Sequence, residues 1–99
     1  MDIRYSLDGT DFVWDSNKAA SNAADHPGIT FEHAAEVFFD PFFRLVDATR
    51  NDEARYAIIG FDRTSKLLFV VHIQQDDATI RIISARKATK NERNDHEHF

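Results

Sequence analysis

The chain has 99 residues and a mass of 11.4 kDa, which is the size of one compact domain and too short for two domains or a membrane transporter. Hydrophobic residues make up 42% of it, enough apolar material to form a core rather than remain disordered. It contains no cysteine, which excludes disulfides, a thiolate nucleophile and any Cys-containing zinc site. The N-terminus has no secretory signal pattern, and no apolar run reaches the ~18 residues of a membrane span. We therefore expect a cytoplasmic protein that does not engage a membrane.

Charge is distributed unevenly along the chain. The formal net charge of −5 argues against a dedicated duplex-DNA binder, which is usually basic. Residues 1–52 hold 10 acidic and 4 basic residues, whereas residues 53–99 hold 7 acidic and 8 basic ones. The densest basic stretch contains Arg81, Arg86, Lys87, Lys90 and Arg93. It could meet phosphates, and the acidic half could attract a basic partner, although an ordinary solvated surface would show the same pattern.

The first half of the chain carries signals for two helices. Asp15 and Ser16 are both able to cap a helix over about residues 17–25, which the break His26-Pro27-Gly28 ends. Thr30 caps a second helix, whose apolar residues recur at i, i+3, i+4 and i+7, and Asp40-Pro41 ends it. That apolar stripe consists of Phe31, Ala34, Ala35 and Phe38. Residues 1–11, ahead of the short apolar run 12–14, could be an added strand or a flexible arm.

The second half is mostly sheet. Strands are expected over residues 42–46, 56–61, 67–73 and 80–85, separated by polar turns over residues 47–52, 62–66 and 74–79. Thr89-x-x-Glu92 has the spacing of a capping box, so a short final helix should begin there and run toward His96. The sequence therefore predicts a single α+β domain over residues 1–99. Two N-terminal helices would pack on one face of a mainly antiparallel sheet of three to five strands, followed by a short C-terminal helix.

Hairpin register converts this order into a site prediction, because alternate residues of a strand share a face. If the last hairpin is centred on Asp76-Asp77, His72 stands opposite Arg81, and either Arg55 or Tyr56 stands opposite His72 on the other side. One face is then expected to be the core beneath the helices; it carries Ala57, Ile59, Phe61, Leu67, Phe69, Val71, Ile73, Ile80 and Ile82. The other is expected to form a shallow groove with a cationic end, which Arg86 and Lys87 could reach; it carries Tyr56, Ile58, Leu68, Val70, His72, Arg81, Ile83 and Ala85.

A His, a Tyr and several cations suit RNA strand scission, in which a 2′-hydroxyl attacks the adjacent phosphate. His can transfer protons near neutral pH, and Arg offers donors that match phosphate oxygens. No metal or other cofactor is needed for this scheme. A structural or salt-bridged His–Arg pair is the competing interpretation. His26 and His33 lack a third ligand and receive no role, and His96 and His98 read as part of a frayed tail that binds metal adventitiously.

Several motifs together resemble the BrnT toxins of bacterial type II toxin–antitoxin pairs. They are Trp14-Asp15-x-x-Lys18-x-x-x-Asn22, Phe31-Glu32-x-Ala34-x-x-Val37-Phe38-x-Asp40-Pro41, Ile59-Gly60, Leu67-Leu68-x-Val70-Val71-His72 and Ile80-Arg81-Ile82-Ile83-Ser84-Ala85-Arg86-Lys87-Ala88-Thr89-x-x-Glu92-Arg93. The run from Ile80 is the most specific, since neither strand propensity nor hydrophobic pattern demands that order.

The resemblance implies a RelE-like fold and a ribonuclease that inhibits translation. It also implies a BrnA-like ribbon-helix-helix antitoxin as partner, with operator DNA contacted only through that antitoxin. On this basis we expect His72, Arg81 and Arg86 to be catalytic, and Arg55, Tyr56, Lys87, Lys90 and Arg93 to bind RNA, with Glu53 a weaker candidate. The alternative is a degenerate toxin that serves as a binding module and co-repressor. The polar loop over residues 47–52 has no His where the family often has one.

Overall fold

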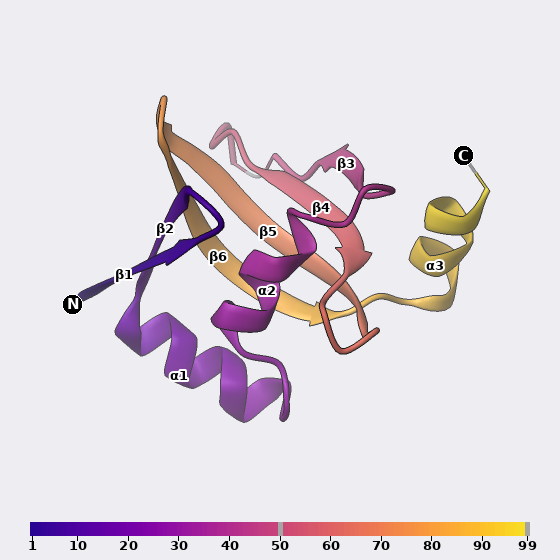
Figure 1. Cartoon of the computed structure of the whole chain (residues 1–99), viewed down its shortest axis with the longest axis horizontal. Helices are drawn as coiled ribbons and strands as arrows, with labels where there is room; N and C mark the ends of the chain where they lie inside the picture. Colours follow the sequence, from indigo (N-terminus) through magenta and orange to yellow (C-terminus); the bar gives the residue numbers. More distant parts are fainter. Residues whose placement is uncertain (50, 99) are drawn as a thin grey trace.

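A computed structural model of the chain describes residues 1–49 and 51–98, and these form six strands and three helices (Figure 1). In chain order the elements are β1 (Asp2–Leu7), β2 (Thr10–Asp15), α1 (Ser16–Asp25), α2 (Phe31–Val37), β3 (Arg44–Asp47), β4 (Tyr56–Phe61), β5 (Leu67–Asp76), β6 (Thr79–Lys87) and α3 (Lys90–Glu97). The α+β class expected from the sequence is confirmed. Among the described residues, no helix is long and apolar enough to cross a membrane.

The three expected helices begin at the expected caps. The carboxylate of Asp15 accepts a hydrogen bond from the N–H of Lys18 at 3.1 Å, and the Thr30 hydroxyl accepts one from His33 at 3.0 Å. Thr89 and Glu92 form the complete capping box of α3. Each cap satisfies backbone donors that a first helical turn leaves unpaired, which is why these short motifs could be recognised in the sequence.

The sheet is larger than expected, with six strands instead of three to five, in the order β1-β2-β6-β5-β4-β3. Residues 1–11 contain an added edge strand, β1, and not a flexible arm; β1 and β2 form an antiparallel hairpin around Asp8 and Gly9, both of positive φ. β2 then runs parallel to β6, while all other pairings are antiparallel. The two helices therefore follow a pair of strands, and β1 and β3 are the edges of the sheet.

For β4 and β5 the face that we expected to be the core is the opposite of the one observed, whereas Ile80 and Ile82 of β6 lie in the core as expected. Helices α1 and α2 lie together on one side of the sheet (Figure 1), and the buried cluster beneath them includes Ile58, Leu68, Val70, Ile82 and Ala85. The residues expected in that layer, such as Phe69, Val71 and Ile73, are only half-buried and point to the other side. We call the covered side the helix face and the other side the open face.

The separation of His72 from Arg81 has a local cause in the β5–β6 hairpin. Its two-residue turn is Asp77-Ala78, one residue later than expected, and bulges fall at Gln75 and Ile83. His72 therefore pairs with Ile82, and Arg81 pairs with Ile73. Because side chains alternate along a strand, this shift by one residue places His72 and Arg81 on opposite faces of the sheet. The expected pairing of Tyr56 with His72 is confirmed.

Two close contacts fix the helices to the sheet near β4. Gly60 lies directly under the end of α2, where an added Cβ would meet Val37 at 2.9 Å and Asp40 at 3.0 Å. The Asp40 carboxylate accepts hydrogen bonds from the N–H groups of Phe42 and Phe61, and it pairs with Nε2 of buried His96 in α3 at 3.2 Å. Burial alone would raise the pKa of Asp40, but these hydrogen bonds together hold it below its ordinary value. His96 is thus an anchor for α3 and not part of a frayed tail.

Candidate functional site at the end of strand β6

The site begins at a stretch of β6 that has a neighbouring strand on only one side. β2 pairs with β6 only from Thr79 to Arg81, so the later residues of β6 have a free side. Asn22 of α1 fills this position: its side-chain amide donates to the carbonyl of Ala85 at 2.9 Å, and its carbonyl accepts from the N–H of Ala85 at 3.0 Å. Both groups are buried. A single side chain therefore replaces a strand and sets the path of the backbone immediately before Arg86.

Arg86 is held in one orientation by three partners. Its Nη1 and Nη2 donate to the two carboxylate oxygens of Glu92 at 2.7 and 2.9 Å, and Nη1 also donates to the carbonyl of Lys87 at 3.2 Å. The guanidinium lies 4.1 Å from the ring centre of Phe69. The hydrogen bonds from Arg86 lower the pKa of Glu92, and Glu92 in turn accepts from the N–H of Thr89 at 2.8 Å in the capping box. The start of α3 thus orients the cation.

On the open face, Arg86 lines a hollow of about 410 Å³ together with Arg55. Arg55 is half-buried, and its Nη2 donates to Glu53 at 3.1 Å, whereas its buried Nε has no hydrogen-bond partner among the described residues. The remaining walls are Asp47, Ala48, Thr49, Phe69, Val71 and Ser84. The arrangement brings two guanidinium groups and two hydroxyls to one concave surface. Guanidinium and hydroxyl donors of this kind suit the non-bridging oxygens of a phosphate.

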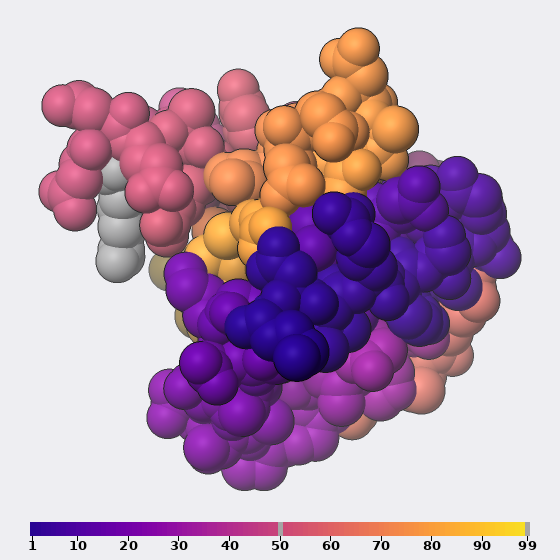
Figure 2. Space-filling model, turned by 90° about the vertical axis from the view of Figure 1, so that its left-hand side faces the viewer, coloured from indigo at the N-terminus to yellow at the C-terminus, as the bar shows by residue number. Residues whose placement is uncertain are grey.

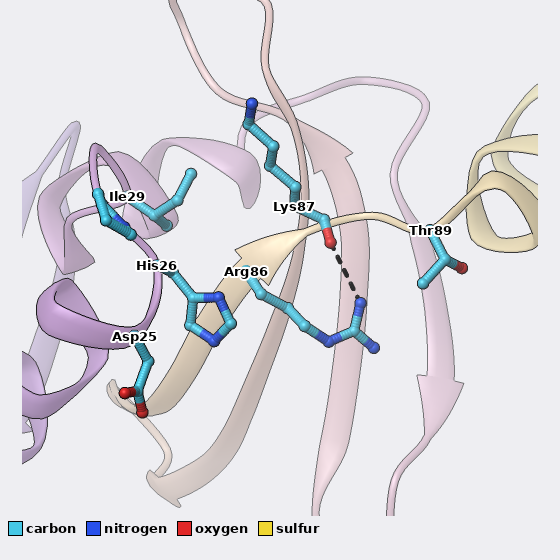
Figure 3. Close-up of a pocket in the computed structure, with 7 residues that line it drawn as sticks. Asp25, His26, Ile29, Arg86, Lys87 and Thr89 are labelled. Atoms are coloured by element: carbon cyan, nitrogen blue, oxygen red, sulfur yellow. Dashed lines mark hydrogen bonds between the residues drawn. The ribbon is translucent and has the colours of Figure 1, made fainter.

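On the other side of Arg86 a second hollow, of about 440 Å³, opens toward the turn between α1 and α2 (Figure 3). It is lined by Asp25, His26, Pro27, Ile29, Arg86, Lys87 and Thr89. His26 lies directly after α1 and is half-buried, and its imidazole forms no hydrogen bond within residues 1–49 and 51–98. Lys87 points away from Arg86 in Figure 3, as expected of the next residue in a strand. Arg86 is thus the wall between the two hollows.

Further cations surround the end of β6. A smaller hollow of about 240 Å³ is lined by Lys66, Lys87 and Arg93 together with Ser65, Leu67 and Ala88. Lys66 donates to the carbonyl of Gly28 at 3.2 Å, and Arg93 lies 3.9 Å from Glu97. Lys90, the first residue of α3, is exposed. The cations of the basic stretch from Arg86 onward therefore gather around one end of the sheet. We call this group, with Lys66, the cationic end; Arg55 precedes the other end of β4 and faces the group across the open-face hollow that it shares with Arg86.

Three of the sequence-derived candidates lie elsewhere. His72 is buried on the helix face, with its ring centre 4.8 Å from that of Phe38 and 6.5 Å from that of Tyr56. Burial lowers the pKa of His72 below 6.5, which outweighs its contact with the carbonyl of Val70. Arg81 makes two hydrogen bonds, at 3.2 and 2.8 Å, to Asp2 in β1. The expected cluster of His72, Arg81 and Tyr56 does not exist, because His72 and Tyr56 face the helices and Arg81 faces the N-terminal hairpin.

Sequence reasoning missed four residues that line these hollows or position Arg86: His26, Thr49, Ser84 and Glu92. Ser84 lies in the specific run from Ile80, and Glu92 was recognised only as part of a capping box. Nothing in the spacing of His26 could reveal that the turn after α1 lies beside the end of β6. Within the described residues, no group of three His, Asp or Glu side chains could hold a metal ion.

The class of protein follows from comparison with known proteins. A family model of toxins from type II toxin–antitoxin systems matches residues 14–92, which include both hollows. The model is described as the ribonuclease toxin BrnT, and the chain belongs to the BrnT family. The fold is similar to the 1.1 Å crystal structure of the Brucella abortus ribonuclease toxin BrnT, with a TM-score of 0.59 and 24% sequence identity. The similarity covers 78% of this chain and 94% of that one. No match was found among curated proteins.

Proposed function

We propose that the chain is an endoribonuclease that cleaves RNA at the cationic end and thereby inhibits translation. The observation that carries this proposal is the pair of guanidinium groups, from Arg55 and Arg86, that line one hollow on the open face. Family membership supports RNA as substrate and an antitoxin as partner. We further propose that the antitoxin is a BrnA-like ribbon-helix-helix protein, and that operator DNA is contacted through it, since the chain itself carries a net charge of −5.

The reaction proposed needs no metal. The 2′-oxygen of a ribose attacks the adjacent phosphorus as its proton leaves, the bond from phosphorus to the 5′-oxygen breaks, and that oxygen takes up a proton. The products are a 2′,3′-cyclic phosphate and a free 5′-hydroxyl. Charge develops on the phosphate oxygens during this exchange, and fixed donors aimed at them lower the barrier. The site must therefore supply donors to the phosphate and at least one group that transfers a proton.

Arg86 is suited to the first role. A guanidinium has five N–H donors, and three are used by the contacts to Glu92 and Lys87. One hydrogen on Nη2 and the hydrogen on Nε have no partner among the described residues, so a phosphate can be bound while the ion pair with Glu92 is kept. Arg55, Lys87, Lys90 and Arg93 would contact that phosphate or its neighbours along the strand.

His26 is suited to the second role, in place of buried His72. Imidazole accepts and donates protons near neutral pH, and His26 shares a hollow with Arg86 and Lys87 (Figure 3). Asp25 lines the same hollow. We assign proton transfer to His26, with Arg86 as the donor to the phosphate between the two hollows. His72 then serves the packing of Phe38, and Arg81 the docking of β1.

The test is induced expression of the chain in bacteria with primer extension on cellular RNA, followed by cleavage of labelled RNA by the purified protein in EDTA. Wild type should arrest growth, cut transcripts and release cyclic-phosphate ends. Arg86→Ala should lower the cleavage rate by about 10²–10³. Arg63→Ala is the matched control, because Arg63 pairs with Asp8 away from both hollows and should cleave like wild type. Unimpaired growth and intact transcripts with wild type would refute the proposal.

A binding role without cleavage is the second candidate. It is favoured by one observation: both guanidinium groups of the open-face hollow are paired with glutamates, Arg55 with Glu53 and Arg86 with Glu92. A degenerate toxin of this kind would bind its antitoxin and act as co-repressor. This role predicts that the chain forms a stable complex with its antitoxin and represses the operon but leaves RNA intact. Arg86→Ala would change neither the complex nor the repression.

A further inference from the structure

The largest concentration of exposed apolar side chains lies at the β3 edge of the sheet, away from the helices α1 and α2. Among the described residues, seven large hydrophobic side chains are exposed; four of them belong to β3 or directly precede it, and a fifth, Tyr56 of β4, pairs with the last residue of β3. These five are Phe42 (61% exposed), Leu45 (57%), Tyr56 (46%), Phe43 (43%) and Val46 (36%), and we call them the β3 patch. Exposed apolar side chains gathered in this way mark a surface that another molecule covers.

The patch belongs to an edge strand, so its backbone is part of the surface. β3 has one strand neighbour in the described part of the chain, β4. Natural proteins protect such edges with charges, prolines or bulges, yet here two of the four residues of β3 are exposed Leu and Val. Figure 2 shows β3 and the loop after it, in pink, projecting from the body of the molecule. An approaching chain would thus meet Leu45 and Val46 without obstruction from α1 and α2, while α3 contacts the start of β3, where Arg44 Nη1 donates to the carbonyl of Asp95 at 2.9 Å.

Apolar side chains of β3 lie on both faces of the sheet, and this placement favours one kind of binding partner. Leu45 pairs with Ile58 and points to the helix face, whereas Val46 pairs with Ala57 and points to the open face. A helix laid on one face would cover only one of them. A segment that runs alongside β3 in the plane of the sheet places alternate side chains over both faces and also satisfies the backbone of the edge.

The charges around the patch favour a segment that carries basic residues. Asp47, Asp52 and Glu53 are exposed directly beyond it. A segment with Lys or Arg beside its apolar residues is attracted by these carboxylates.

We propose that the antitoxin of this toxin supplies an extended, basic and apolar segment that adds a strand to β3. The proposal rests on membership of a toxin–antitoxin family and not on the assignment of RNA cleavage. The added strand also accounts for how the antitoxin would block the toxin. Asp47, Ala48 and Thr49, which continue from β3, form one wall of the open-face hollow that Arg55 and Arg86 line. A chain added to β3 therefore lies beside that hollow and restricts access to it.

The experiment uses the full chain and the polypeptide encoded by the adjacent reading frame as probe, with affinity measured by calorimetry and amide hydrogen exchange followed in the complex. Leu45→Lys should weaken binding at least 10-fold, because it places a cation in the apolar contact. The matched control is Ile3→Lys, an apolar residue 37% exposed on β1 at the opposite edge, which should bind like wild type. Amides of residues 44–47 should exchange more slowly in the complex than in the free chain.

The remaining outcomes overturn the proposal. Unchanged affinity of Leu45→Lys, protection of β1 instead of β3, or absence of a complex would each show that the patch does not bind the antitoxin. A dimer of the chain alone that Leu45→Lys disrupts would assign the patch to a second copy. The free Leu45→Lys variant should cleave RNA at the wild-type rate. A failure of the antitoxin proposal can therefore be distinguished from a failure of the proposed RNA cleavage.

Discussion

Replacement of Asn22 by Ala tests whether one side chain maintains the end of β6. The substitution removes the donor to the Ala85 carbonyl and the acceptor for the Ala85 N–H. Asn22 is 8% exposed and Ala85 is fully buried, so water cannot readily replace either bond. A buried polar group without a partner costs about 1–3 kcal/mol. Two such groups give an expected loss of about 2–6 kcal/mol in the free energy of unfolding.

This loss is a large part of the stability of a domain of this size, which is roughly 5–15 kcal/mol. A loss of 2 kcal/mol, the lower figure, corresponds to a fall in melting temperature of roughly 8–16 °C. Urea unfolding followed by the fluorescence of Trp14 measures it directly. The control is Asn17→Ala, an exposed residue of the same helix, which should change the free energy by less than about 0.5 kcal/mol. If Asn22→Ala also stays within 0.5 kcal/mol, Asn22 does not substitute for a strand.

Three further predictions concern packing, pH and salt. Gly60→Ala should destabilise the chain by about 1–3 kcal/mol, since its Cβ would lie 2.9 Å from Val37 under α2; equal stability by urea unfolding would show that α2 can move away. Burial lowers the pKa of His72, so its contribution to stability is complete above pH 6.5 and is lost as the pH falls through the lowered pKa. The free energy of unfolding should therefore decrease from pH 7.5 to 5.5 in wild type and decrease less in His72→Gln. Parallel pH curves for the two proteins would contradict this. Lys87→Ala should reduce the slope of log affinity for single-stranded RNA against log salt by about 0.7, as expected for one lost phosphate contact, while Lys18→Ala leaves the slope unchanged; equal slopes for both variants would remove Lys87 from the interface.

Local signals were read correctly from the sequence, and long-range ones were not. Asp15, Thr30 and Thr89 were recognised as caps because a cap involves residues only three positions apart. The pairing of His72 with Arg81 was predicted wrongly because it depended on the position of one turn and on two bulges, at Gln75 and Ile83, that leave no clear mark in the hydrophobic pattern. A shift by one residue then placed these two side chains on opposite faces.

The candidate site could be predicted only in part for the same reason. Arg86, Lys87, Lys90 and Arg93 were named from charge and resemblance and lie together around the end of β6, while Arg55 shares the open-face hollow with Arg86; their roles stay predictions. His26 was dismissed because its surroundings are set by a contact between the α1–α2 turn and a strand end about 60 residues later. The anchoring of His96 on Asp40 spans 56 positions and was equally invisible.

The insertion of β6 between β2 and β5 has a consequence for biosynthesis. Asn22 and Ala85 are 63 positions apart, and β2 has no parallel partner until β6 exists. Such distant pairings form slowly, because the entropy of closing a long loop must be overcome before any contact is gained. We expect a nascent chain to fold the β4–β5–β6 meander first and to dock its N-terminal hairpin and α1 last. The two hollows that Arg86 lines therefore form only after β6 has left the ribosome.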